Sequence, residues 1–255
     1  MSSIEIAVTC TWFQRRLCWM LSSILQQVGN VPDIVFSIGY PRNNGKPTTE
    51  EVIGFFKGKG IQFREFPYDG LKVIQYRGLV RNEQLRRAAC DWILFADCDM
   101  VYHPKFFENL SWQLKHRVRF RRDKRILSAR RVSLDKGFCK DYFNNADKRI
   151  YPCVVDSAGT LVESWPVFEI SRNCGAGYFQ LVNRKSCLEI TGGQYVDPKA
   201  NWDWGWFRGH RMQGARSDMQ FRSKMHGVRQ IRTMPQYHLN HERDNEFRRH
   251  LEIQR

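Results

Sequence analysis

Two aspartates one residue apart, Asp97 and Asp99, are the residues of this chain best suited to chemistry. They follow the apolar run Trp92–Ala96, which has no polar interruption and is typical of a strand buried on both faces of an α/β sheet. Open α/β sheets bind ligands at the carboxyl ends of their strands. Two carboxylates there can hold a divalent cation directly or through water, and hard oxygen ligands suit Mg²⁺ or Mn²⁺. The stretch therefore predicts a cation that neutralises a departing diphosphate.

The alternative interpretation is that Asp97 and Asp99 only end a strand and begin a turn, since Asp-x-Asp alone is a weak motif. The preceding residues favour the metal site. Arg81 and Asn82 open a predicted helix that runs through Cys90, and the apolar strand follows at once, giving RNEQLRRAACDWILFADCDM. This stretch resembles the nucleotide-sugar glycosyltransferases of the GT-A fold. Their pattern is Arg-Asn, a helix that ends in small residues, and a hydrophobic strand closed by Asp-x-Asp.

The resemblance implies an α/β fold with a mixed, Rossmann-like central sheet flanked by helices. We expect a single domain over residues 1–255, because the sequence contains no internal repeat and no stretch with the composition of an interdomain linker. Within it, residues 1–103 are expected to form a nucleotide-binding half, and residues 104–255 a half that binds acceptor and metal. No apolar run approaches the ~18 residues that indicate a transmembrane helix.

The resemblance also implies which residues contact the nucleotide. In GT-A enzymes the loop after the first strand touches it, which makes Thr9, Thr11 and Arg15 candidates together with Arg81 and Asp97. For Arg15 the alternative is a solvated helix start. One departure concerns the second strand, after which family-2 glycosyltransferases place an acidic residue, often in a D-D-x-S turn. This chain reads IGYPRNNGKP there and has no acidic residue that could contact the ribose or uracil at that point.

The spacing of apolar residues and the helix-capping residues predict the strands and helices that must position these residues. Glu50 and Glu51 are favourably placed in the first turn of a predicted helix. The predicted strands are Ile4–Cys10, Asp33–Ile38, Ile61–Phe66, Ile126–Val132 and Val228–Met234; the predicted helices are Gln14–Gln27, a segment capped by Thr48 or Thr49 and ending near Lys59, Arg81–Cys90, a segment from His103-Pro104, and one from about Asn183.

Glycine and tryptophan residues of the C-terminal third are candidates for binding a sugar. Gly177 lies among small residues, where the backbone can approach a ligand closely, although a plain strand–helix unit is the alternative. Trp202, Trp204 and Trp206 form an aromatic cluster next to Gly205, and we take Trp204, Gly205 and Trp206 as candidates for sugar stacking, with core packing as the alternative.

Three titratable residues follow. Asp218 opens a predicted helix and is a candidate general base for an acceptor hydroxyl, or else an N-terminal cap. His238 and His241 are predicted to lie beyond the last strand, as metal ligands or as surface residues. The order of these features is similar to the beta-4-type galactosyltransferases. The resemblance implies that Asp218 matches an acid of the catalytic segment, His241 the metal histidine and His238 the methionine ligand. The acidic run of that family is reduced here to Arg216-Ser217-Asp218.

The charge of the chain points to a polyanionic partner. Lys and Arg total 41 against 26 acidic residues, a net charge of +15, beyond the ~2–8 usual for a small domain. The segment 115–131 reads KHRVRFRRDKRILSARR, which favours contact with phosphates; a solvated helix end and edge strand is the alternative. Candidate partners are nucleic acid, an anionic membrane surface and an acidic glycan.

The cysteines and the N-terminus predict a cytoplasmic protein. Eight cysteines are scattered without any C-x-x-C pair, so a zinc ribbon is not expected and reduced thiols are the simplest interpretation. The sequence MSSIEIAVTC lacks the basic start and apolar core of a secretory signal. A place at a membrane surface, or in a host cytoplasm for a viral protein, fits the same observations.

Together these features predict a metal-dependent glycosyltransferase that uses a nucleotide-diphosphate sugar, with UDP as the expected nucleotide. Asp99, helped by Asp97 and a C-terminal histidine, would hold the Mn²⁺ or Mg²⁺, and Asp218 would deprotonate the acceptor for inverting transfer. A retaining outcome remains open. The acceptor could be hydroxymethylated DNA, as in phage DNA modification, or a lipid-linked or anionic glycan. The rival class is a basic nucleic-acid-binding protein without catalysis, which explains the charge but not the Asp-x-Asp strand.

Overall fold

The computed structural model describes residues 3–43, 47–69, 77–117, 124–134, 167–171, 179–190, 221–222 and 225–239. The strands are β1 (Ile4–Thr9), β2 (Ile34–Pro41), β3 (Gln62–Tyr68), β4 (Trp92–Ala96), β5 (Met100–Tyr102), β6 (Ile126–Leu134), β7 (Val167–Ser171), β8 (Phe179–Asn183) and β9 (Val228–His238). The helices are α1 (Gln14–Leu25), α2 (Thr49–Lys57), α4 (Arg77–Arg87), α5 (Phe106–His116) and α7 (Arg184–Ile190).

The nine strands of the described ranges belong to one mixed sheet with the order β3-β2-β1-β4-β8-β6-β9-β5, and β7 pairs with β6. The first four strands in this order are parallel, which requires helical crossovers between them. Strand β8 is antiparallel to both β4 and β6, and β9 is parallel to β6. The parallel βα units and the antiparallel additions confirm the predicted α/β class with a mixed central sheet.

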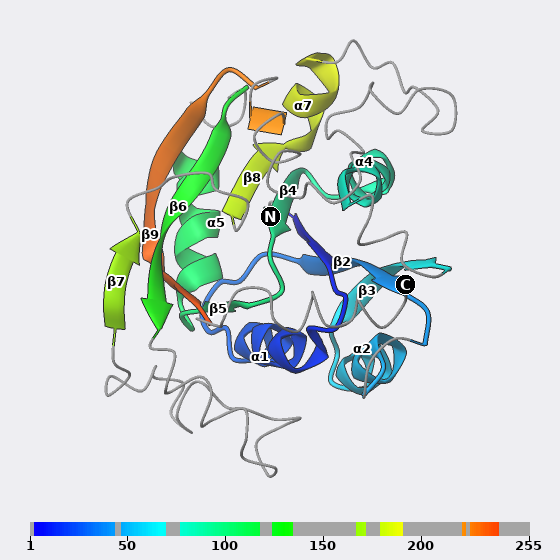
Figure 1. The fold of residues 1–255 in the computed structure, drawn as a ribbon. Helices are drawn as coiled ribbons and strands as arrows, with labels where there is room; N and C mark the ends of the chain where they lie inside the picture. Colours follow the sequence, from blue (N-terminus) through cyan, green and yellow to red (C-terminus); the bar gives the residue numbers. More distant parts are fainter. Residues whose placement is uncertain are drawn as a thin grey trace.

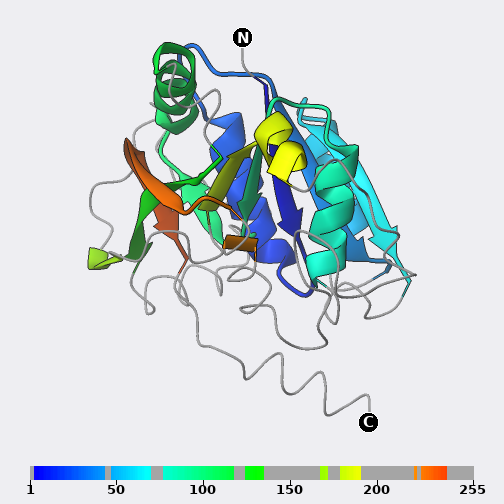
Figure 2. The ribbon, with the colours of Figure 1, turned by 90° about the horizontal axis from the view of Figure 1, so that it is seen from above.

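Helices cover both faces of this sheet (Figures 1 and 2). Side chains of α1, α2 and α5 pack on one face, and side chains of α4 and α7 pack on the other. The residues of β4 alternate between the two cores, with Leu94 in the first and Ile93 and Phe95 in the second, all fully buried. The uninterrupted apolar run in the sequence is therefore explained by burial on both faces.

Helix α2 begins as its sequence predicts. The backbone N–H of Glu51 donates to the Thr48 hydroxyl at 3.2 Å, and the N–H of Thr48 donates to the Glu51 carboxylate at 2.7 Å. This reciprocal capping box satisfies two backbone donors that the helix itself cannot pair.

Helix α4 begins and ends earlier than predicted. It starts at Arg77, before the Arg-Asn pair, and it stops at Arg87 instead of continuing to Cys90. The chain leaves the helix there because the N–H of Ala89 donates to the buried carboxylate of Glu5 at 3.1 Å. A tertiary hydrogen bond therefore sets the end of α4.

The prediction that the last strand ends at Met234 was also wrong, because β9 continues to His238. In the sequence, Pro235 suggests that the strand stops before it, but in the structure Pro235 lies inside β9. The pairing of β9 with β6 shifts register between Ala129 and Arg131 and leaves extra residues on the β9 side. Such a bulge accommodates a proline, which has no N–H to give to the ladder.

Two strands, β5 and β7, have no counterpart in the sequence prediction. Strand β5 has only three residues, too few for a period to show, and it exists because it pairs with the end of β9.

Among the described cysteines, Cys10, Cys18, Cys90, Cys98 and Cys187 are free and buried. None of the helices in the described ranges combines the length and the apolar composition that a membrane crossing requires.

Candidate active site

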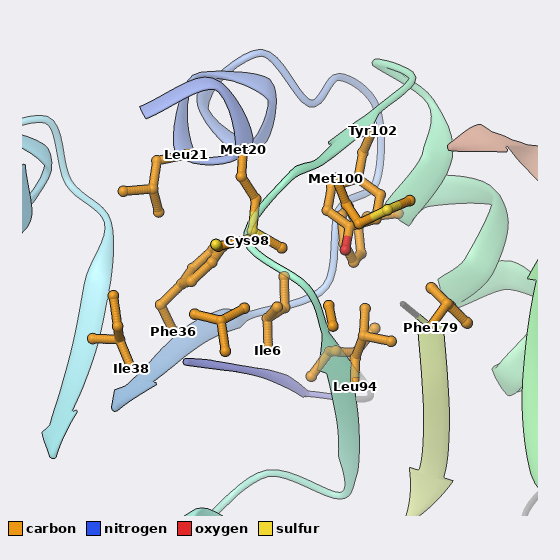
Figure 3. Packing of buried hydrophobic residues seen from close by; sticks show 14 of the residues in the cluster. Ile6, Met20, Leu21, Phe36, Ile38, Leu94, Cys98, Met100, Tyr102 and Phe179 are labelled. Carbon is orange, nitrogen blue, oxygen red and sulfur yellow. The ribbon is translucent and has the colours of Figure 1, made fainter. Parts of the chain in front are cut away.

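The candidate site lies where β4 ends, at the edge of the sheet to which the parallel strands point. The chain turns through Asp97, Cys98 and Asp99 before β5 begins. Cys98 faces the core, where it lies beside Phe36 and Met20 (Figure 3). The two aspartates are directed elsewhere, and each has a different partner.

Asp97 forms an ion pair with Arg81 of α4. The distance from Arg81 Nη2 to Asp97 Oδ1 is 3.7 Å. The Arg81 side chain is 1% exposed and that of Asp97 is 31% exposed. The guanidinium also lies over the Phe95 ring, 5.8 Å from its centroid. Arg81 is therefore a buried cation beside the candidate site, and its guanidinium faces the partly exposed carboxylate of Asp97.

Asp99 meets His238, the last residue of β9. Asp99 Oδ2 and His238 Nε2 are 3.2 Å apart, and the two side chains are 11% and 18% exposed. The pairing of Met100 with His238 creates this contact, and the N–H of Leu239 donates to the Asp99 carbonyl at 2.9 Å. The sequence separates the two residues widely, and the β5–β9 ladder brings them together.

The loop after β1 borders the same edge. Thr9 ends the strand and Thr11 lies in the loop; both are partly exposed. Trp12 has a φ of 60°, a left-handed backbone that is unusual for a bulky residue and often occurs at functional loops. Arg15 lies in the first turn of α1, and its side chain is outside the described part of the structure.

A tight contact between α4 and β2 helps to fix this edge. A Cβ placed on Gly39 would lie 2.2 Å from Cγ1 of Val80, so only glycine allows α4 to approach so closely. On the same helix, Gln84 Nε2 donates to the carbonyls of Val8 at 2.9 Å and Ser37 at 2.8 Å. Sequence reasoning missed Gln84, although its spacing of three from Arg81 on one helix face was a usable signal.

The thiols of Cys98 and Cys18 are both buried in the core on one face of the sheet. A hydrogen bond to Cys10, followed by burial, raises the pKa of the Cys98 thiol well above its ordinary value. Burial raises the pKa of Cys18 to about 12, with a smaller contribution from Cys10. Thiols held protonated in this way are poor nucleophiles, so they act as packing groups beneath the site.

Several predicted site residues lie outside the described residues. They are Gly177, Trp204, Gly205, Trp206, Asp218 and His241, together with Arg121 and Arg122 of the basic segment. Within the described ranges, no group of three His, Cys, Asp or Glu side chains is arranged to hold a metal ion. The structure brings Asp99 and His238 together, and it brings Arg81 to Asp97.

The donor set at Asp99 nonetheless suits a divalent cation. A carboxylate oxygen is a hard ligand and a neutral imidazole is a common ligand of transition ions such as Mn²⁺. Two ligands side by side on one ion, each at about 2.1 Å, lie about 3 Å apart. The 3.2 Å between Asp99 Oδ2 and His238 Nε2 is compatible with that separation.

Comparison with known proteins identifies the fold of the chain. No protein-family model and no curated protein matches the chain. Among solved structures, S. aureus TarS 1-349 in complex with UDP-GlcNAc has a TM-score of 0.57 and 10% identity, covering 95% of this chain and 59% of that one. The same protein in complex with UDP has a TM-score of 0.56 and 10% identity, covering 93% and 60%.

A second solved protein is the mannosyltransferase PcManGT from Pyrobaculum calidifontis in complex with GDP-Man and Mn²⁺. It has a TM-score of 0.54 and 14% identity, covering 96% of this chain and 59% of that one. The chain thus spans about three fifths of the length of these proteins. At identities this low, structural similarity establishes the architecture alone. The chain has the predicted GT-A fold, an α/β domain with a mixed central sheet flanked by helices.

Proposed function

We propose that the chain is a metal-dependent glycosyltransferase that moves a sugar from a nucleotide-diphosphate sugar, UDP-linked by expectation, to an acceptor hydroxyl. The observation that supports it most is the meeting of Asp99 and His238, 3.2 Å apart, at the carboxyl end of β4. Proteins of this fold bind UDP-GlcNAc, or GDP-Man with Mn²⁺, in the solved structures. A carboxylate and an imidazole at the ligand edge of such a sheet suit the same task.

In this proposal Asp99 and His238 hold the divalent cation, with His241 as a further candidate ligand. The bound cation supplies charge neutralisation to the departing diphosphate. Asp97 faces Arg81 at the same turn, and in this proposal it would accept a hydrogen bond from the donor or support the cation through water. Thr9, Thr11 and Arg15 border the donor side from the loop after β1.

The acceptor half of the proposal rests on residues 104–255. Asp218 removes the proton of the acceptor hydroxyl, and Gly177, Trp204, Gly205 and Trp206 hold the sugar by close backbone approach and stacking. Direct attack of the deprotonated hydroxyl on the anomeric carbon, from the face opposite the departing nucleoside diphosphate, would give inversion. The net charge of +15 favours a polyanionic acceptor, either hydroxymethylated DNA or a lipid-linked or anionic glycan.

Donor hydrolysis and transfer test the proposal. The purified chain is incubated with UDP- and GDP-sugars, with Mn²⁺, with Mg²⁺ or with chelator, and release of the nucleoside diphosphate is measured. We expect release that requires the cation and that increases when an acceptor is added. Asp218→Asn should lower kcat by about 10²–10⁴-fold while donor affinity is kept. Full turnover in excess chelator, or no binding of any nucleotide sugar, would contradict the proposal.

A further inference from the structure

We propose that an ion pair at the carboxyl ends of β2 and β3, Arg42 with Asp69, recognises the base of the nucleotide sugar and selects uracil or guanine over cytosine and adenine. The distance from Arg42 Nε to Asp69 Oδ1 is 3.5 Å. The inference rests on the proposed function, because it assigns the nucleoside end of the same substrate. Asp69 supplies a carboxylate that the segment after β2 lacks, since residues 42–49 contain no acidic residue.

Strand pairing brings Arg42 and Asp69 together. Strands β2 and β3 are parallel, and Pro41 pairs with Tyr68 at their carboxyl ends. Continued by one residue, this register places Arg42 opposite Asp69, and the N–H of Arg42 donates to the Tyr68 carbonyl at 3.0 Å. The ion pair is therefore a consequence of the register of the sheet.

The backbone of the loops at this edge is unusual. Among the described residues, the non-glycine residues with a left-handed backbone are Trp12, after β1, and Asn43, after β2, with φ of 60° and 52°. Such backbone is uncommon and clusters where proteins hold ligands. The N–H of Asn43 donates to the carboxylate of Glu50 on α2 at 3.1 Å. The turn that carries Arg42 is therefore held in place by α2 as well as by β3.

Fold stability does not account for the ion pair. The Arg42 side chain is 56% exposed and that of Asp69 is 90% exposed, and exposed ion pairs contribute little to stability. The 3.5 Å contact joins one nitrogen of Arg42 to one oxygen of Asp69. A guanidinium has five N–H groups and a carboxylate has two oxygens. Both side chains can therefore bond a ligand while they stay paired.

The place of the ion pair in the sheet suits the far end of a nucleotide. In the order β3-β2-β1-β4, Asp97 and Asp99 follow β4, which is two strands from β2 and three from β3. At about 4.8 Å per strand, these separations are about 10 and 14 Å. Open α/β sheets bind nucleotides along this edge, at the point where the strand order reverses, which here lies between β1 and β4. A nucleotide with its diphosphate at Asp99 can therefore extend its base over the ends of β2 and β3.

The chemistry of the ion pair favours a base that has a ring N–H beside a carbonyl. A carboxylate only accepts hydrogen bonds, and a guanidinium only donates them. Uracil and guanine offer both partners side by side, and the adjacent carbonyl makes their ring N–H a strong donor to an anion. Cytosine and adenine have an unprotonated ring nitrogen in that position, whose lone pair would face the carboxylate. Their amino groups are weaker donors, so binding through an amino group gives less affinity.

The test is binding of UDP, GDP, CDP and ADP to the full chain, measured by isothermal titration at one concentration of Mn²⁺. The variant is Asp69→Asn, which keeps the size of the side chain but replaces one acceptor oxygen with an amide N–H₂ donor. The control is Asp33→Asn, the same change at an exposed aspartate just before β2, at the opposite edge of the sheet. Circular dichroism verifies that both variants are folded.

We expect the native chain to bind UDP or GDP at least about tenfold more tightly than CDP and ADP, the effect of one hydrogen bond to a charged group. In Asp69→Asn the affinity for the preferred nucleotide should fall about tenfold. The affinity for CDP should stay the same or rise, because the amide can donate to the ring nitrogen of cytosine. Asp33→Asn should keep the native ranking.

A methylated nucleotide tests the ring N–H directly. The probe is 3-methyl-UDP, or 1-methyl-GDP if GDP is the preferred nucleotide, since each lacks that N–H. The native chain should bind the probe about tenfold more weakly than its parent, and Asp69→Asn should bind the two alike. A purely structural role of Asp69 would weaken both ligands by the same factor.

Three results would overturn the inference: a native chain that does not prefer UDP or GDP, a ranking that Asp69→Asn leaves unchanged, or equal losses in Asp69→Asn and Asp33→Asn. Its failure can be distinguished from failure of the proposed function. Base selectivity that depends on Asp69, in a chain that transfers no sugar, would keep the inference and remove the transferase. Sugar transfer with a ranking independent of Asp69 would keep the transferase and remove the inference. No binding of any nucleotide would remove both.

Discussion

Asp97 and Asp99 are separated by one residue, yet their surroundings are built in different ways. Asp97 faces Arg81, which comes from the helix immediately before its own strand and is 1% exposed. Asp99 faces His238, which comes from the last described strand and is 18% exposed. The first pair is a buried cation with a partly exposed carboxylate. The second is a pair of potential metal ligands on neighbouring strands.

This difference suggests that the two acids of the motif have separate tasks. A carboxylate that faces a buried guanidinium contributes to stability, since removing it takes away an anion that the buried charge interacts with. A carboxylate beside an imidazole is needed for binding a cation. Asp-x-Asp then combines a structural acid and a ligand acid, and single substitutions should separate the two effects.

The largest expected effect is on catalysis by Asp99→Ala. Transfer and Mn²⁺ binding should be lost, by about 10³-fold or more in kcat/KM, because the diphosphate loses several kcal/mol of charge stabilisation. Isothermal titration with Mn²⁺ and a donor-release assay measure this. The matched control is Asp91→Ala, an exposed carboxylate just before the same strand. Unchanged Mn²⁺ affinity in Asp99→Ala would assign the cation elsewhere.

Asp97→Asn should act first on stability. It removes the carboxylate that faces the buried guanidinium of Arg81, and we expect a loss of about 1–3 kcal/mol in the free energy of unfolding. Urea denaturation measures it. The double variant Arg81→Met with Asp97→Asn should regain part of that loss, because the buried charge is gone. Normal stability with abolished Mn²⁺ binding would instead show that both aspartates share the cation.

His238→Gln should weaken Mn²⁺ binding by about 10–100-fold with little change in stability. Affinity for Mg²⁺ should fall less, since imidazole suits transition ions better than it suits Mg²⁺. Competitive titration of the two ions measures the preference. His116→Gln, at an exposed histidine on α5, is the control. Unchanged Mn²⁺ affinity in His238→Gln would show that His238 is not a ligand.

The smallest effect is expected from Cys98→Ala, although Cys98 lies between the two aspartates. Its side chain packs in the core, so we expect a loss of about 1 kcal/mol in stability and a kcat within about twofold of the native chain. The raised pKa of Cys98 keeps its thiol protonated, so thiol alkylation near pH 8 should require unfolding. Rapid labelling of the native chain would show that the thiol faces the site.

Much of the N-terminal half could be predicted because its signals are local. The apolar run 92–96 and the capping box at Thr48 each depend on residues that are neighbours in the chain. The α/β class with a GT-A sheet was implied by the family resemblance of the stretch around Asp97 and Asp99, and it is confirmed. The roles assigned to Asp218, His241 and the tryptophan cluster remain predictions.

The errors occurred where tertiary contacts override local preference. Glu5 ends α4 at Arg87, and a bulge carries β9 past Pro235 to His238. Neither effect can be read from a short window, because the partner residue lies elsewhere in the chain. The prediction that placed His238 beyond the last strand failed for this reason.

The sequence alone determined that a buried strand ends in two carboxylates beside a helix with an Arg-Asn pair, because hydrophobic period and charge are local properties. Only the tertiary structure decided the partners of those carboxylates. Arg81 reaches Asp97 because α4 packs tightly against Gly39 of β2, and His238 reaches Asp99 because β9 pairs with the three residues of β5. Contacts between distant segments depend on the register of the sheet, which is set by packing over the whole domain.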